Sequence, residues 1–296
     1  MRREDHRALL LGGQAPALGA HLEDADRRRV VDEDARLAQR ADGLRQPAPV
    51  ALTKEAAAQP VGVDARLARQ HAQEKLLLRH FEAEEPDRHV RSGADVDRLV
   101  ESPPAETVPF VFEAVRKARA GLPAHIPLIG FSGAPFTVAS YLIEGGSSRN
   151  YIETKRIMYQ DPGAWRALME RLVRIITAYL NGQIAVGAQA VQLFDSWIGC
   201  LSPADYRTFI LPYMKTLFAG ITPGTPVIHF GTDTAGLLEL MAEAGGSVLG
   251  VDWRIDLDVA WRRIGYDRAV QGNLDPVTLF ASQDEIRRQV RRILDM

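Results

Sequence analysis

The chain has 296 residues and a formal net charge of −2, with 25% charged residues. This balance excludes a broad basic surface of the kind that attracts nucleic acid or an anionic membrane, so an anionic ligand would need cations gathered locally. The single cysteine, Cys200, excludes an internal disulfide, and no membrane-spanning apolar run or export signal is evident, so we expect a cytoplasmic protein.

The composition changes near residue 90. Residues 1–90 contain no Ile, Ser, Asn, Tyr, Trp or Cys, but hold 13 Arg and one aromatic residue, Phe81. A core without large apolar side chains gains little free energy of folding, since the burial of apolar surface contributes roughly 25 cal/mol per Å². We expect residues 1–90 to form a disordered or loosely helical extension, with helix favoured over 65–71, and residues 91–296 to form the folded domain. The alternative is that residues 1–90 are translated from the wrong frame or strand of a GC-rich gene.

After residue 90, short apolar runs alternate with helical stretches. The run 126–129 predicts a strand that leads into a glycine-rich turn over 130–136. A long helix is expected to begin at Asp161-Pro162, where a capping residue precedes proline at the first helical position, and to end near Gly187. Further strands are expected over 190–194, 226–230, 247–251 and 268–271, and further helical starts at Ser202, Asp275 and Ser282.

This alternation predicts an α/β protein with a parallel sheet, either a closed barrel or an open doubly wound sheet. The first glycine turn lacks GxGxxG spacing and no lysine follows it, which disfavours nucleotide binding. In a parallel barrel the reactive residues lie just past the carboxyl ends of the strands. The candidates at such positions are Phe131, Ser132, Asp195, Ser196, His229, Asp252, Trp253, Asn273 and Asp275.

Several candidates also have a purely structural explanation. Asp275 precedes a proline and is typical of a helix cap, and Asp195 and Ser196 can stabilise a turn. His229 lies between apolar neighbours and fits a satisfied structural histidine better than a general base, while Tyr141 fits a core position and a pocket wall equally well. Spacing predicts no catalytic triad and no metal site, because the nitrogen and sulfur ligands after residue 90 are only His125, His229 and Cys200.

Seven sequence blocks after residue 90 follow the order of one known family. They are 91–96 (RSGADV), 128–137 (LIGFSGAPFT), 140–146 (SYLIEGG), 154–156 (TKR), 187–199 (GAQAVQLFDSWIG), 250–253 (GVDW) and 271–276 (QGNLDP). On these blocks residues 91–296 closely resemble the uroporphyrinogen decarboxylases of haem and porphyrin biosynthesis.

The resemblance implies a (β/α)8 TIM-type barrel, usually a homodimer. The family's carboxy-lyase reaction removes carbon dioxide from the four acetate groups of uroporphyrinogen III, giving coproporphyrinogen III, without cofactor or metal. The substrate's protonated pyrrole can act as the electron sink, so the protein needs cations for the carboxylates, an anion facing the pyrrole NH groups and a proton donor. By the same resemblance, Tyr141 contacts the substrate, Ser196 bonds a substrate carboxylate, and Phe131 and Phe194 are aromatic pocket walls.

The chain departs from the family pattern in three places. Residues 1–90 lack the amino-terminal Met-Arg-Gln-Ala-Gly-Arg motif, no Phe-Ser-Asp block supplies the aspartate that faces the pyrroles, and the sequence stops at Met296 before the expected Gly-His-Gly segment. We therefore expect an incomplete barrel in which the first two strands and the last strand are missing or unmatched, no identifiable catalytic residue, and no turnover.

Two other functions are compatible with the sequence. A corrinoid-linked methyltransferase shares the barrel family, but such enzymes normally hold zinc through a His-x-Cys arrangement, and His229-Phe230-Gly231 contains no cysteine. The other is a binder that holds a porphyrinogen without converting it.

Overall fold

The computed structural model describes residues 89–146 and 148–296. The extension and the helix predicted within residues 1–88 lie outside this described part. Val90 already belongs to the folded unit, because its side chain is buried and its N–H donates a 2.9 Å hydrogen bond to the carbonyl of Leu142. Val90 is therefore packed into the described part, and the predicted domain boundary at residue 91 stays a prediction.

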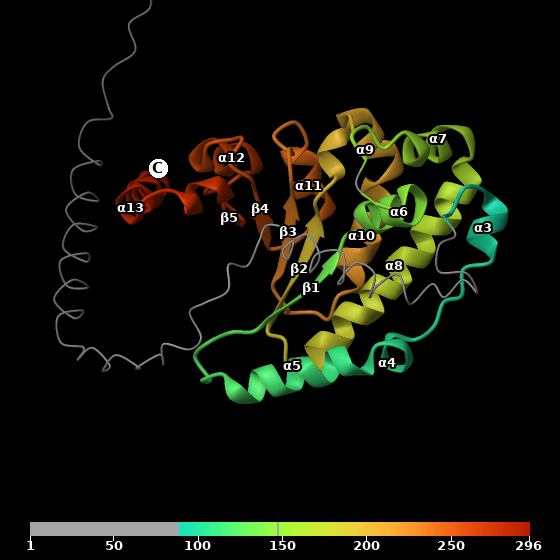
Figure 1. Cartoon of the computed structure of the whole chain (residues 1–296), viewed down its shortest axis with the longest axis horizontal. Helices are drawn as coiled ribbons and strands as arrows, with labels where there is room; N and C mark the ends of the chain where they lie inside the picture. Colours follow the sequence, from blue (N-terminus) through green and yellow to red (C-terminus); the bar gives the residue numbers. More distant parts are fainter. Residues whose placement is uncertain (1–88, 147) are drawn as a thin grey trace, which may run out of the picture. The chain divides into compact units, whose positions relative to one another are not determined.

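Five parallel strands form one sheet in which spatial order follows chain order (Figure 1). They are β1 (Ile129–Gly133), β2 (Ala190–Asp195), β3 (Val227–Gly231), β4 (Val248–Gly250) and β5 (Ala269–Gln271). Sequential parallel neighbours joined by helices are the wall of a (β/α)8 barrel. The outer edges of β1 and β5 pair with no other strand in the described residues, so the predicted incomplete barrel is confirmed.

Helices occupy the connections between the strands. They are α3 (Gly93–Asp97), α4 (Pro104–Thr107), α5 (Pro109–Gly121), α6 (Pro135–Glu144), α7 (Ile152–Gln160), α8 (Pro162–Ala185), η3 (Ile198–Cys200), α9 (Pro203–Phe209), α10 (Leu211–Gly220), α11 (Leu238–Ala244), α12 (Leu257–Ile264), η4 (Pro276–Phe280) and α13 (Gln283–Leu294). None of these helices combines the length and the apolar character that crossing a membrane requires, within the residues described.

The first strand is displaced from its predicted position. The apolar run 126–129 was expected to be the strand and 130–136 the turn, but β1 covers Ile129–Gly133 and α6 begins at Pro135. Residues before β1 are instead held by Arg119, whose guanidinium donates hydrogen bonds to the carbonyls of Ile126 and Pro123 at 2.6 and 2.8 Å. The glycine-rich block is therefore part of the sheet.

The predicted helix starts are confirmed by their caps. In each case a side-chain oxygen accepts a hydrogen bond from a backbone N–H two or three residues further on, which satisfies a donor of the first turn. The capping residues are Asp161, Ser202, Asp275 and Ser282. The element after Asp275 is a short 3₁₀ helix and not the expected α-helix.

The two faces of the sheet have different environments because strand side chains alternate. One face lies under helices and is fully buried, with Val191, Leu193 and Leu249 among its residues. The opposite face, which would line the interior of a closed barrel, is partly open, and Ile129 and Phe131 are 42% and 38% exposed there. The folded core therefore lies between the sheet and its helices.

Helix α5 is fixed against α8 beside the open edge of β1. The Phe112 ring lies over Gly182, where an added Cβ would come within 2.6 Å of the ring, and its centroid is 6.0 Å from that of Tyr179. Phe112 is 6% exposed, whereas Phe110 on the same helix is 49% exposed. Phe112 is thus a buried apolar contact between the two helices.

We predict that Phe112→Ala lowers the free energy of unfolding by about 3 kcal/mol, because it removes a buried ring and leaves a cavity over Gly182. Phe110→Ala is the matched control and should change it by about 0.5 kcal/mol or less. Urea denaturation of the two variants and the parent measures both values. Equal losses would show that α5 is not anchored through Phe112.

Candidate functional site

A cavity of about 510 Å³ opens beside β1. Its walls come from five elements or their ends: α5, β1, the start of α6, the last two turns of α8 and the end of β2. None of the residues that line it is charged, and most are apolar or aromatic. Pockets of this size and character bind small organic molecules by shape and apolar contact, with few polar groups to set orientation.

Three phenylalanines form an aromatic row across the open face of the sheet. Phe131 of β1 and Phe194 of β2 have ring centroids 6.0 Å apart at 86°, and Phe194 and Phe230 of β3 are 5.8 Å apart at 68°. These edge-to-face contacts are favourable beyond the area they bury. Phe131 and Phe194 also line the cavity, so the predicted pocket walls do come together.

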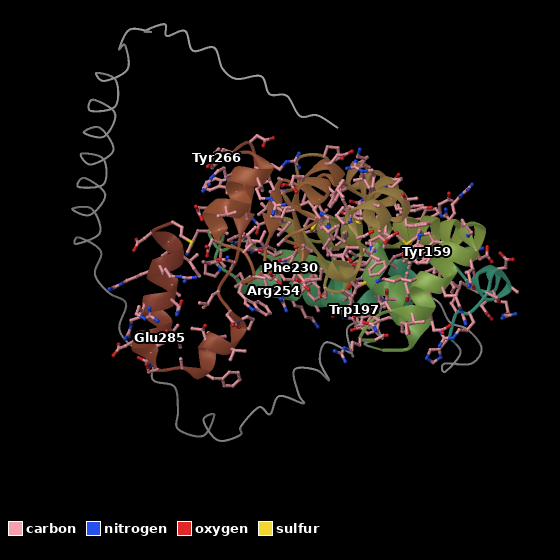
Figure 2. All side chains as sticks on the ribbon, turned by 90° about the horizontal axis from the view of Figure 1, so that it is seen from above. Tyr159, Trp197, Phe230, Arg254, Tyr266 and Glu285 are labelled. Carbon is pink, nitrogen blue, oxygen red and sulfur yellow. The ribbon has the colours of Figure 1, made fainter. Side chains whose placement is uncertain are left out.

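Ser196 follows β2 directly and lines the same cavity, half-buried. Tyr141 does not line it: this tyrosine lies on α6, is 9% exposed, and its ring stacks on Trp197 at a centroid distance of 3.9 Å. The structure thus brings three of the four predicted site residues to one cavity. Tyr141 contacts the residue next to Ser196, and Figure 2 marks Trp197 on this part of the molecule.

The loop that carries Ser196 and Trp197 is fixed from the helix side of the sheet. The hydroxyl of Thr137 donates a 2.9 Å hydrogen bond to Oδ1 of Asp195 and accepts one of 3.4 Å from the N–H of Trp197. Gly199 lets this loop lie against the loop after β3, because a Cβ there would come within 2.4 Å of the Thr232 carbonyl oxygen. Thr137 was not among the predicted site residues, since a threonine within a helical stretch carries no signal of its partner.

Asp195 is a buried carboxyl on the side of the sheet away from the open face. Its side chain is 0% exposed, and Oδ2 has no hydrogen-bond partner. Burial raises the pKa of Asp195 to about 7, and the hydrogen bond from Thr137 only partly opposes this. The turn-stabilising explanation therefore fits Asp195 better than contact with a ligand in the cavity.

His229 lies in an apolar environment. It is buried on the helix-covered face, with its ring 5.2 Å from that of Phe218 on α10, as expected of a structural histidine. Its ring nitrogens make no hydrogen bond of ordinary geometry, but a backbone hydrogen bond with Met241 acts on its pKa in the direction opposite to burial. Burial lowers the pKa of His229 to about 4, so the ring is neutral near pH 7.

The remaining candidates organise the loops at the strand ends. Asp252 is buried and accepts hydrogen bonds from the backbone N–H groups of Asp233 and Arg254 at 2.7 and 3.1 Å. The Arg254 guanidinium also pairs with Asp252 and lies 4.3 Å from the ring centroid of Trp253. Figure 2 labels Arg254. Asn273 donates to the carbonyl of Ile255. Each of these contacts fixes a loop, and Arg254 is the cation that they place at this rim.

A metal site would need several ligands in one place. Among residues 89–146 and 148–296, no three His, Cys, Asp or Glu side chains are grouped so that they could hold a metal ion. The thiol of Cys200 is half-buried, and burial raises its pKa to about 11, so it is protonated near pH 7.

The family model for uroporphyrinogen decarboxylase (URO-D) matches residues 82–296, which include the cavity, the aromatic row and the loop after β2. The chain belongs to the uroporphyrinogen decarboxylase family. The match begins ahead of the first predicted block at residue 91 and covers the whole described part. The family assignment made from the sequence blocks is confirmed.

Curated relatives agree with this assignment. The chain is 52% identical over 206 residues to a uroporphyrinogen decarboxylase from Carboxydothermus hydrogenoformans, a match that covers 69% of this chain and 59% of that protein. A uroporphyrinogen decarboxylase from Salinispora tropica is 55% identical over 206 residues, covering 69% of this chain and 55% of the relative. The chain therefore spans less than two thirds of the length of these relatives.

One solved structure supports the fold. A methyltransferase from Methanosarcina mazei superposes with a TM-score of 0.58 and 20% sequence identity, covering 66% of this chain and 59% of that one. At this identity the likeness shows the barrel architecture only.

We predict opposite pH effects from the two buried groups. Asp195 has a folded pKa above its ordinary value of 3.8, so its contribution to stability is present below pH 3.8 and is lost as the pH rises to about 7. His229 has a folded pKa below its ordinary value of 6.5, so its contribution is present above pH 6.5 and is lost as the pH falls to about 4. Between pH 4 and 6.5 the two effects largely cancel.

We predict that in Asp195→Asn only the pH dependence of stability due to His229 remains. Asparagine keeps the Thr137 hydrogen bond but does not titrate. The stability of the variant relative to the parent is expected to rise by up to about 4 kcal/mol between pH 4 and 7, at 1.36 kcal/mol per pKa unit. Urea unfolding at a series of pH values gives both curves. Parallel curves would show that Asp195 ionises normally in the folded chain.

Proposed function

We propose that this chain carries the porphyrinogen-binding wall of a uroporphyrinogen decarboxylase, a carboxy-lyase that acts on the four acetate groups of uroporphyrinogen III. The observation that supports this most strongly is the match of the uroporphyrinogen decarboxylase family model to residues 82–296, which include the cavity, together with 52% identity over 206 residues to a curated uroporphyrinogen decarboxylase. The row of three phenylalanines on the open face offers flat apolar contact for pyrrole rings, and Ser196 offers one hydroxyl to a carboxylate.

The reaction requires more than an apolar wall. Cations must bind the acetate and propionate groups, and arginine suits this because its guanidinium forms two hydrogen bonds to a carboxylate. The cavity lining contains no charged residue, and the guanidinium of Arg254 at the strand-end rim is already paired with Asp252. The described residues therefore place no set of free cations in the cavity lining, which supports our proposal that this chain does not turn the substrate over alone.

Asp195 is not a substitute for the anion that should face the pyrrole NH groups. Its carboxyl is 0% exposed, lies on the helix side of the sheet and accepts from Thr137. With a pKa raised to about 7, much of it is protonated near neutral pH. The anion and the proton donor have to come from outside the cavity lining seen here.

The two alternatives predicted from the sequence differ in their requirements. For a corrinoid-linked methyltransferase, His229 would have to face a metal in the pocket, yet it lies on the opposite face of the sheet against α10. A non-catalytic porphyrinogen binder requires only the wall, so binding and turnover must be measured separately. Homodimerisation and a cytoplasmic location, which the resemblance and the composition imply, stay predictions.

We predict that the purified 296-residue chain binds uroporphyrinogen III under anaerobic conditions but yields no coproporphyrinogen III. Product separation by carboxylate number measures turnover, and equilibrium dialysis measures binding. Formation of coproporphyrinogen would contradict the proposed lack of turnover. Absence of binding would contradict the proposed porphyrinogen wall itself.

Ser196→Ala should weaken binding of uroporphyrinogen about tenfold, because hydrogen bonds to charged groups contribute on the order of 1.5–3 kcal/mol. Ser202→Ala is the control: it removes a helix cap outside the cavity and should lower stability by about 1 kcal/mol without changing affinity. If both variants bind equally well, Ser196 does not contact the ligand.

A further inference from the structure

Arg254 lies in the loop after β4, at the carboxyl ends of the strands, where parallel barrels bind their ligands. Its guanidinium pairs with Asp252, and its Nε lies 3.8 Å from Oδ1 of Asp233 in the loop after β3. The side chain of Arg254 is 40% exposed, whereas that of Asp252 is 2% exposed. Arg254 therefore turns one part of its guanidinium to a buried carboxylate and leaves another part accessible to solvent.

Two contacts hold this guanidinium in a fixed orientation. The carboxylate of Asp252 is itself held by the backbone N–H groups of Asp233 and Arg254. The guanidinium also lies over the indole of Trp253, an arrangement that attracts a cation to an aromatic face. Arginine carries five N–H donors in a rigid fork, and the described partners of Arg254 occupy only some of them. A carboxylate could therefore bind the outer N–H groups while the pair with Asp252 stays in place.

The aromatic row ends next to this loop. The ring of Phe230 lies over Gly250, where an added Cβ would come within 3.0 Å of Cδ2 of Phe230. Gly250 is the last residue of β4, so the row extends from the cavity beside β1 to the strand that leads into the Arg254 loop. Figure 2 labels Phe230 and Arg254, which lie near one another in that view. Ser196 and Arg254 thus lie beyond opposite ends of one apolar surface.

Two other arginines near the sheet have a different role. Arg119 donates to carbonyls ahead of β1, and Arg268 donates a 3.0 Å hydrogen bond to the carbonyl of Gly246, ahead of β4. Both therefore fix the chain at the amino ends of the strands, whereas active sites of parallel barrels form at the carboxyl ends. Arg254 is at the carboxyl end and keeps N–H groups accessible.

We propose that Arg254 binds a carboxylate of a ligand whose flat ring lies on the aromatic row, and that Asp252 positions its guanidinium. The fork of N–H donors matches the two oxygens of a carboxylate, which can accept two parallel hydrogen bonds. The ligand replaces solvent and the loose contact with Asp233. The identity of the ring rests on the proposed function, in which it is a porphyrinogen, whereas the carboxylate contact is also tested without it.

Equilibrium dialysis of uroporphyrinogen III under anaerobic conditions, with the full 296-residue chain, tests the contact. Arg254→Gln should weaken binding about thirtyfold, because it removes a charge-assisted pair of hydrogen bonds. Arg262→Gln is the matched control: Arg262 is 63% exposed, pairs with Asp258 on α12, and should leave affinity unchanged when replaced. Equal affinities of the two variants would overturn the inference and leave the proposed porphyrinogen wall standing.

Asp233→Asn separates ligand binding from a structural role of Arg254. The change removes a negative charge 3.8 Å from the guanidinium, and asparagine tolerates the left-handed backbone of this residue, whose φ is 59°. If Arg254 binds a carboxylate, uroporphyrinogen III should bind about threefold more tightly, because the competing anion is gone. Unchanged or weaker binding would show that the guanidinium only supports the loop, and would contradict the inference.

A smaller probe makes the result independent of the porphyrinogen. Benzoate is a flat ring with one carboxylate, and benzamide is the same ring without the charge. In the unaltered chain, benzoate and not benzamide should shift the NMR signal of the Arg254 Nε–H, assigned through its bonds to the Arg254 backbone so that no variant is needed. No shift with benzoate, or equal shifts with both compounds, would overturn the inference. A benzoate shift in a chain that does not bind uroporphyrinogen III would support the carboxylate site and contradict the proposed function.

Discussion

The arrangement of this chain depends on one constraint: a parallel sheet needs cover on both faces and partners along both edges, and these residues supply cover for one face only. The helices pack on the outer face, where Val191, Leu193 and Leu249 are buried. Nothing in the described part covers the inner face to the same extent, and Phe131 on β1 is 38% exposed there. The cavity, the aromatic row and the open edge all follow from this asymmetry.

The alternation of side-chain directions along β2 also decides which residues can contact a ligand. Along β2 and the residue after it, Phe194 and Ser196 line the cavity, whereas Asp195 between them turns to the helix side and bonds to Thr137. A one-residue change in register would exchange these roles and bury a serine and a phenylalanine in place of the carboxyl. The buried, hydrogen-bonded Asp195 thus helps to hold the loop that presents Ser196, without facing the cavity.

The sequence predicted those features that depend on local chemistry. The strand after residue 190, the helix start at Asp161 and the cap at Ser202 needed only apolar runs and capping residues. The position of β1 could not be found this way, because the run 126–129 is more apolar than the glycine-rich stretch that forms the strand. Glycine weakens a strand by propensity, and here contacts with β2 outweigh that preference.

Features of the site that depend on contacts between residues far apart in the chain could not be predicted from the sequence either. The stacking of Tyr141 on Trp197 joins residues far apart in sequence, and neither residue type indicates the other. Gln183 is polar, as many helix residues are, so only the fold shows that it completes the edge of β1. Likewise, the apolar neighbours of His229 predicted its burial, but not the Phe218 ring and the Met241 backbone that interact with it.

High identity to intact relatives is compatible with an incomplete site because the two properties depend on different contacts. The core of the described part is packed from its own residues, such as the fully buried Trp165 and Leu168 of α8. Converting the proposed octa-acid substrate would in addition depend on charges that converge on the open face, and the cavity lining contains none. A well-packed wall therefore does not entail a competent active site. The wall requires only that its side chains pack together. The active site requires cations, an anion and a proton donor at the face that these residues leave uncovered.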